Sequence, residues 1–155
     1  MKKNFYIVLL AITTLGNMMS SVFAEPDNID KNIEVLDERE IAQTVLESIF
    51  NVFENYTFID FAGKISEEFN PSRNEFITNV DESFYEKDVL SLDFFMETVD
   101  LTENNLAVVF KWEKKLRDKD TGIVDLKQGR AEFVFVWVND KWMLIKVAGD
   151  DPFLV

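Results

Sequence analysis

The apolar residues of this chain change their spacing near residue 89. Before it they recur every three or four positions, the pattern of amphipathic helices, and after it they recur at every second position, the pattern of strands with one buried face. Helices followed by strands predict an α+β fold in which the helices pack against one sheet. A length of 155 residues leaves room for one such domain.

Two capping boxes mark the starts of two helices. Asp37 with Glu40 opens the first, and Ser72 with Glu75 opens another, each just ahead of an apolar run with helical spacing. The apolar positions are Ile41, Val45, Ile49, Val52, Phe53 and Tyr56 in the first run, and Phe76, Ile77, Val80 and Phe84 in the other. Between them we expect a short helix capped by Asp60 and ending near Phe69, so three helices precede the strands.

Four long strands are predicted after these helices. Their apolar stripes are separated by turn residues at 104–105, 118–122 and 139–141. Strands joined by short turns pair antiparallel, so the sheet is expected to be mostly antiparallel. In the third strand the alternate positions, which point to the other face of the sheet, are also apolar: Val134, Val136 and Val138. This predicts that both faces of the strand are partly covered.

The first 24 residues have the form of a cleavable export signal. Lys2 and Lys3 precede an apolar run over residues 5–15, and Ala24 ends a segment that suits a signal peptidase. The run is shorter than the ~20 residues of a membrane span, although an uncleaved anchor or a buried first helix is the alternative. We expect cleavage after Ala24, a flexible leader over 25–36, a domain over 37–155, and a periplasmic or secreted protein without a membrane segment.

Composition excludes several kinds of chemistry. The formal net charge of −13 and the lack of a basic cluster argue against nucleic acid or an anionic membrane as partner. The chain has no histidine and no cysteine, and no Gly-rich phosphate loop. It therefore lacks the usual near-neutral acid or base, the commonest zinc ligand and any thiol nucleophile. We expect no metal and no other cofactor, and we assign no catalytic residue.

Short motifs connect this chain with a known superfamily. They are Tyr-Thr-Phe-Ile-Asp at 56–60, Ile-Ser-Glu-Glu-Phe at 65–69, Gly-Arg-Ala-Glu-Phe at 129–133, Phe-Val-Trp-Val at 135–138 and Asn-Asp-Lys-Trp at 139–142. With the order of helices and strands, they resemble the nuclear-transport-factor-2-like superfamily, which includes polyketide-cyclase-like and ketosteroid-isomerase-like proteins. The resemblance covers residues 37–153. A cystatin-like fold is the main competitor, but it has only one long helix before its strands.

The resemblance implies an architecture and no particular reaction. It implies three N-terminal helices packed in the concave face of a curved, mostly antiparallel sheet, often with a pocket inside this cone, and often a homodimer. One fold hosts enzymes, binding modules and assembly domains, so function has to be argued from the site.

Aromatic side chains are the candidate site. An apolar ligand pocket would be lined by residues of the helices and strands, and the candidates are Tyr56, Phe94, Phe110, Trp112, Phe133, Phe135 and Trp137. The same strand aromatics can instead form an ordinary core or a sheet-to-sheet dimer face. The sequence leaves open whether residues 149–155 fold back over the mouth of a pocket.

These observations predict an exported, non-catalytic domain that binds a small apolar ligand or a protein partner. One alternative is a cofactor-free isomerase or dehydratase of the ketosteroid-isomerase type, which needs a shielded carboxylate near a tyrosine. Its candidate residues here are Tyr56, Asp60, Asp93 and Glu97, but we favour solvated strand acids and a helix cap as the explanation of the carboxylates. The other alternative is a pure protein-assembly domain without a cavity.

Overall fold

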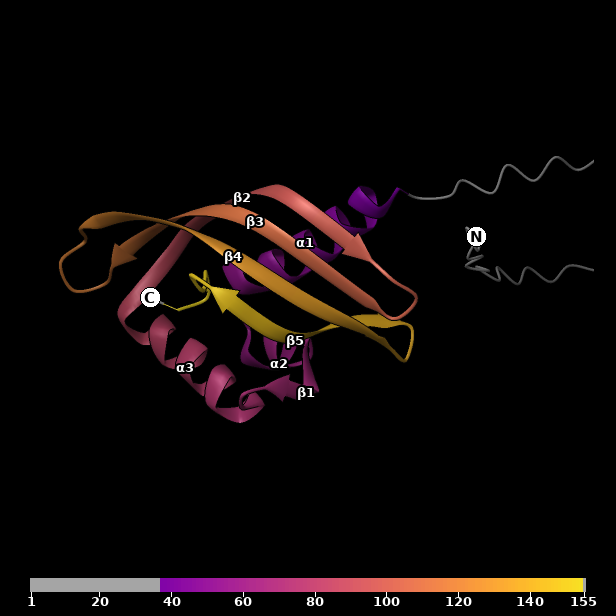
Figure 1. Cartoon of the computed structure of the whole chain (residues 1–155). Helices are drawn as coiled ribbons and strands as arrows, with labels where there is room; N and C mark the ends of the chain where they lie inside the picture. The colour runs from indigo at the N-terminus through magenta and orange to yellow at the C-terminus, as the bar shows by residue number, and fades with distance from the viewer. Residues whose placement is uncertain (1–36, 155) are drawn as a thin grey trace, which may run out of the picture. The chain divides into compact units, whose positions relative to one another are not determined.

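The computed structural model describes residues 37–154, so the expected export signal and leader lie outside the described residues. The elements in chain order are α1 (Glu38–Glu54), α2 (Phe58–Ala62), β1 (Ile65–Asn70), α3 (Arg73–Glu86), β2 (Lys87–Leu101), β3 (Asn105–Asp118), β4 (Val124–Val138) and β5 (Lys141–Gly149) (Figure 1). Their sheet has the order β1-β5-β4-β3-β2. It is antiparallel except for the pairing of β1 with β5. The α+β class and the curved sheet are thus confirmed (Figure 1).

Both capping residues act as predicted. The Asp37 carboxylate accepts a hydrogen bond from the backbone N–H of Arg39, and the Ser72 hydroxyl accepts one from the N–H of Glu75. Each bond satisfies one of the free amides in the first turn of α1 or α3. These caps fix where the two longer helices begin and hence which of their residues face the sheet.

The second helix was predicted wrongly at both ends. Its N-cap is Thr57, whose hydroxyl donates to the Asp60 carboxylate at 2.5 Å, and it ends at Ala62. Residues 65–70 form a strand instead, with Ile65 and Phe69 buried. Pairing beside β5 explains the difference, because this edge of the sheet offers ladder hydrogen bonds that local sequence does not reveal.

The core lies between α1 and the inner face of the sheet. Phe50 of α1 is at its centre, with ring centroids of Phe94, Phe110 and Phe133 at 5.1–6.0 Å in edge-to-face arrangements. The inward positions of β3 from Leu106 to Leu116, and those of β4 from Ala131 to Phe135, are fully or nearly fully buried, as their period of two predicts. With no cysteine in the chain, this aromatic packing supplies the stability of the domain.

Two bulges interrupt the edge strand β2. Its pairing with β3 shifts between Val89 and Ser91 and again between Met96 and Thr98. Leu90 is the extra residue at the first shift and is 46% exposed. After the second bulge Val99 is the inward residue, because one extra residue reverses the side of the sheet to which later residues point.

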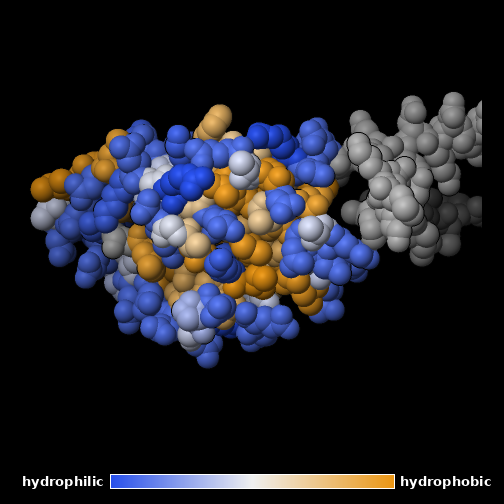
Figure 2. Space-filling view, in the orientation of Figure 1, coloured by the Kyte–Doolittle hydropathy of each residue, from blue (hydrophilic) through white to orange (hydrophobic). Residues whose placement is uncertain are grey.

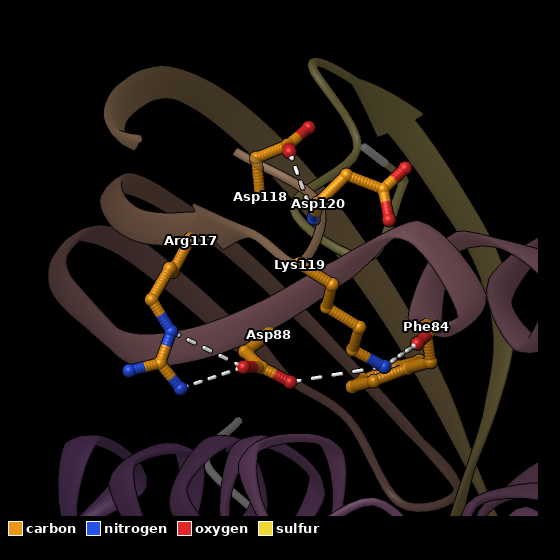
Figure 3. Close-up of polar contacts among 6 residues, drawn as sticks. All are labelled: Phe84, Asp88, Arg117, Asp118, Lys119 and Asp120. Carbon is orange, nitrogen blue, oxygen red and sulfur yellow. Dashed lines mark hydrogen bonds and ion pairs between the residues drawn. The ribbon is translucent and has the colours of Figure 1, made fainter. Parts of the chain in front are cut away.

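A polar cluster joins α3, β2 and the β3–β4 turn (Figure 3). Arg117 pairs with the Asp88 carboxylate at 2.7 Å, and the ammonium of Lys119 bonds to the carbonyl of Phe84 and lies 3.7 Å from Asp88. The hydrogen bond from Arg117 lowers the pKa of Asp88. The side chain of Asp118 accepts from the N–H groups of Asp120 and Thr121, which closes the turn.

Candidate functional site

A pocket of about 630 Å³ lies between α1, α2 and the β4–β5 hairpin. Its wall from the helices and the following turn consists of Thr44, Val45, Ser48, Ile49, Val52, Ile59, Asp60, Gly63 and Lys64, and its wall from the hairpin consists of Phe135, Trp137, Asp140, Lys141, Trp142 and Met143. A volume of this size is in the usual range for small-molecule sites, about 300–1,000 Å³.

The hairpin wall is built by a tight turn. Asn139 and Asp140 have φ angles of 50° and 60°, the left-handed conformation that two-residue hairpin turns require. This turn places Trp137 directly opposite Trp142, and their rings meet edge to face with centroids 5.1 Å apart. Trp137 remains 38% exposed, so an aromatic surface is presented at the pocket.

Polar and apolar side chains share the lining of the pocket. The Lys64 ammonium donates to the Ser48 hydroxyl at 2.6 Å, and the Thr44 hydroxyl donates to the backbone carbonyl of Glu40. The remaining polar side chains are those of Asp60, Asp140 and Lys141, all on exposed residues. The pocket therefore combines an apolar wall with several polar groups, which suits an apolar molecule carrying a polar end.

The structure distributes the candidates from sequence over four places. Phe135 and Trp137 line the pocket. Phe94, Phe110 and Phe133 pack in the core around Phe50. The other two, Trp112 and Tyr56, lie in separate contacts described below.

Tyr56 is engaged away from the pocket lining. Its ring stacks on Phe84 with centroids 3.9 Å apart, and its hydroxyl donates to the Asp81 carboxylate at 2.8 Å. Burial in the first place, and then this hydrogen bond, raise the pKa of Tyr56 above its ordinary value, so the hydroxyl remains a donor.

The carboxylates considered for proton transfer are not shielded. Asp60 and Asp93 are exposed, and Glu97 pairs with Arg130 at 2.6 Å and with Lys111 at 3.2 Å. Hydrogen bonds from Arg130 and then Lys111 lower the pKa of Glu97. A general base of the ketosteroid-isomerase type needs a carboxylate in an apolar site, and none of these three residues has that environment.

Sequence reasoning missed the helix side of the pocket. Val45 and Val52 were assigned to a continuous core face, but both are only half-buried and line the pocket. The breadth of the apolar arc on α1 could have indicated this. Leu46 and Phe50 already pack against the sheet, so the outer part of the arc is left to line a pocket. The contribution of Lys64 carried no signal, because it depends on α2 ending at Ala62.

The 150–154 segment folds inward after β5. Gly149 has a φ of 84°, which turns the chain away from the sheet, and Phe153 is fully buried. The indole N–H of Trp112 donates to the carbonyl of Asp150 at 2.8 Å. The question left open by the sequence is answered for these residues: Phe153 enters the core, and none of residues 150–154 lines the pocket at the hairpin.

Within residues 37–154, no group of three or more aspartate, glutamate, histidine or cysteine side chains is arranged to hold a metal ion. In the same part of the chain, no helix has the length and apolar character needed to cross a membrane.

The architecture is the nuclear-transport-factor-2-like fold. Among similar solved structures is a ketosteroid isomerase-like protein from Erwinia carotovora atroseptica, 12% identical, with a TM-score of 0.60 over 75% of this chain and 98% of that one. A nuclear-transport-factor-2-like superfamily protein from Salmonella enterica is 14% identical, with a TM-score of 0.58 over 74% of this chain and 90% of that one. A putative calcium/calmodulin-dependent kinase II association domain from Exiguobacterium sibiricum is 13% identical, with a TM-score of 0.61 over 77% and 98%.

The sequence itself matches no protein-family model and no curated protein. Identities of 9–14% to the solved structures establish a shared fold and carry no function with them.

Proposed function

We propose that this protein is a non-catalytic binding domain that holds a small apolar ligand in the pocket between α1, α2 and the β4–β5 hairpin. The single observation that carries the proposal is a cavity of about 630 Å³ with the exposed ring of Trp137 at its wall. An exposed aromatic beside half-buried valines leaves apolar surface that a ligand would remove from water, at roughly 25 cal/mol per Å².

Native mass spectrometry of the purified protein tests this proposal. We expect a reproducible small-molecule adduct, and we expect Val45→Trp to lose it because the larger side chain fills the pocket. Asn79→Trp adds the same bulk on the exposed side of α3 and should keep the adduct. A bare protein in all three samples, even after incubation with aromatic and aliphatic compounds, would count against ligand binding and favour an assembly domain.

Binding is favoured over the isomerase alternative by the state of the carboxylates. The carboxylates that line the pocket belong to exposed residues. Tyr56 and Asp81, which are hydrogen-bonded to each other, do not line the pocket. Turnover that disappeared on Asp60→Asn would reverse this preference.

We also propose that the outer face of β3, β4 and β5 pairs with a second copy of the chain. Outward positions on this face include Val109, Val134 and Val136, with Glu132 and Lys146 beside them in the strand registers. Figure 2 shows apolar surface gathered over these strands. A patch that holds both signs of charge can match its own copy across a two-fold axis, which an interface between identical subunits requires.

Export is a further proposal, because the first 24 residues lie outside the described part of the chain. Expression in a bacterium followed by intact-mass measurement of the exported fraction tests it. The expected N-terminus is Glu25, and Ala24→Lys should block processing, because a signal peptidase requires a small residue there. An unprocessed protein in the cytoplasm would contradict the proposal.

A further inference from the structure

Lys114 is a fully buried cation held by the 150–154 segment. It points inward from β3, and its side-chain ammonium donates to the backbone carbonyls of Pro152 at 2.6 Å and Leu154 at 2.8 Å. The ammonium also lies 5.7 Å from the ring centroids of Phe53 and Trp112. Within residues 37–154 no carboxylate oxygen lies within 4 Å of it.

A neutral carbonyl is a weak partner for a buried charge. Taking an ammonium out of water costs several kcal/mol in real proteins, and a paired anion offsets this cost better than two peptide dipoles do. Desolvation in the first place, and the neighbouring Lys127 in the second, lower the pKa of Lys114 to about 8, while the charge of Asp151 acts in the opposite direction. The two carbonyls and Asp151 all belong to the 150–154 segment, so a carboxylate in place of this segment could bond to the ammonium directly.

The same segment fills an aromatic cage beside this cation. The Phe153 ring is fully buried, and its centroid lies 4.9 Å from that of Phe53 and 5.2 Å from those of Phe61 and Phe133. These three rings come from α1, α2 and β4, so the cage is assembled by the fold and not by the segment that occupies it. A ligand that fits this cage needs a flat apolar ring and, next to it, a hydrogen-bond acceptor for the Lys114 ammonium.

Hydrogen bonds with Trp112, Lys114 and Arg130 tie the occupying segment to the sheet, but no strand pairing extends beyond Gly149. Asp150 bonds to Arg130 through its N–H and its carboxylate, and its carbonyl accepts from Trp112. Residues 151–154 belong to no helix or strand. The segment can therefore leave the cage by rotation about residues near Gly149, without breaking a strand pairing.

We propose that Lys114 and the rings around Phe153 form an internal binding site for a small aromatic carboxylate, and that the chain's own 150–154 segment occupies this site until such a ligand displaces it. The ring of the ligand takes the place of Phe153, and its carboxylate accepts from Lys114 in place of the two carbonyls. The proposal does not depend on the pocket at the β4–β5 hairpin, because the residues that line that pocket do not include Lys114, Phe53, Phe61 or Phe133.

The three tryptophans allow the two sites to be distinguished. The Trp112 indole N–H is bonded to Asp150 and reports on the segment, whereas Trp137 and Trp142 line the hairpin pocket. The full-length protein, labelled with ¹⁵N, is titrated with 3-phenylpropanoate while the three indole signals are followed by NMR. We expect the Trp112 signal to move, together with the backbone signals of Phe153 and Leu154.

Variants of the segment and of the cation sharpen the test. Phe153→Ala removes the competing ring and should tighten binding of 3-phenylpropanoate about tenfold or more, since each 1.4 kcal/mol of lost competition corresponds to a factor of ten. Phe153→Leu is a milder version should the alanine variant fold poorly. Lys114→Met keeps the apolar stem and removes the charge, so it should abolish the preference for 3-phenylpropanoate over the neutral 3-phenylpropan-1-ol.

A matched control and a clear failure complete the design. Lys141→Met removes a cation from the hairpin pocket and should leave the Trp112 response unchanged. The proposal is overturned if the Trp112 signal stays fixed in the Phe153→Leu and wild-type proteins, or if acid and alcohol bind equally well. Movement of the Trp137 and Trp142 signals alone would also overturn it, while supporting ligand binding at the hairpin pocket.

Discussion

Gly129 has no side chain because Trp112 and Asp150 occupy the space where one would lie. A methyl group there would be 2.7 Å from an indole carbon of Trp112 and 2.6 Å from the Cβ of Asp150. We expect Gly129→Ala to lower the free energy of unfolding by about 1–3 kcal/mol, the usual cost of overpacking. Urea unfolding measures this, with Gln128→Ala, on the exposed neighbouring residue, expected to change it by less than about 0.5 kcal/mol.

Asp151 and Lys114 give stability two opposite pH dependences. Burial raises the pKa of Asp151 to about 6 and lowers that of Lys114 to about 8. Between about pH 4 and 6 the folded protein binds more protons at Asp151 than the unfolded chain does, so the free energy of unfolding falls as pH rises. Between about pH 8 and 10.5 the unfolded chain binds more protons at Lys114, so the free energy of unfolding rises with pH.

Denaturant unfolding across this pH range, with one variant for each residue, checks the prediction. Each group contributes a slope of at most about 1.4 kcal/mol per pH unit. Asp151→Asn should flatten the acid limb, since Asn can still accept from the N–H of Phe153, and Lys114→Met should flatten the alkaline limb. Slopes that persisted in both variants would mean that other groups control them.

At the scale of elements, the sequence predicted the periodicity and the antiparallel pairing of the four long strands, and it missed the pairing of residues 65–70 with β5. The caps at Asp37 and Ser72 and the alternation of β3 and β4 are local, and each was read correctly. Residues 65–70 were misread because a short segment with two adjacent glutamates becomes a strand only through its partner β5. The pocket was predicted in part for the same reason: Phe135 and Trp137 follow from strand parity, whereas the place of Lys64 depends on where α2 ends.

The junction between α2, β1 and α3 depends on one side chain. The half-buried guanidinium of Arg73 donates to the carbonyls of Ile65 at 3.1 Å and Ala62 at 2.8 Å. We expect Arg73→Met to cost about 1.5–3 kcal/mol, because two buried carbonyls lose a charged donor. Arg117→Met is the comparison: its ion pair with Asp88 is shorter but exposed, so its loss should cost less than about 1 kcal/mol. Thermal and urea unfolding would rank the two variants, and a reversed order would contradict this account.

At the scale of the whole molecule, the outer sheet face decides the state of association. If β3, β4 and β5 pair with a second copy, Val134→Glu should convert a dimer to a monomer in sedimentation equilibrium, because a carboxylate would be buried without a partner. Thr78→Glu places the same charge on the exposed side of α3 and should leave the dimer intact. A wild-type protein that sediments as a monomer at high concentration would refute the proposed interface.

The bulges of β2 bear on the colloidal behaviour of the protein. β2 is the long edge strand of the sheet, opposite the short edge strand β1, and an unbroken edge strand offers a row of free backbone groups on which further chains can grow into fibrils. Two register shifts within the 15 residues of β2 break that row into short stretches. A straight strand from another chain could therefore form hydrogen bonds with only one short stretch at a time. Phe95 is exposed on this strand and the chain has no cysteine, so the bulges are the feature of β2 that opposes growth of fibrils from this edge.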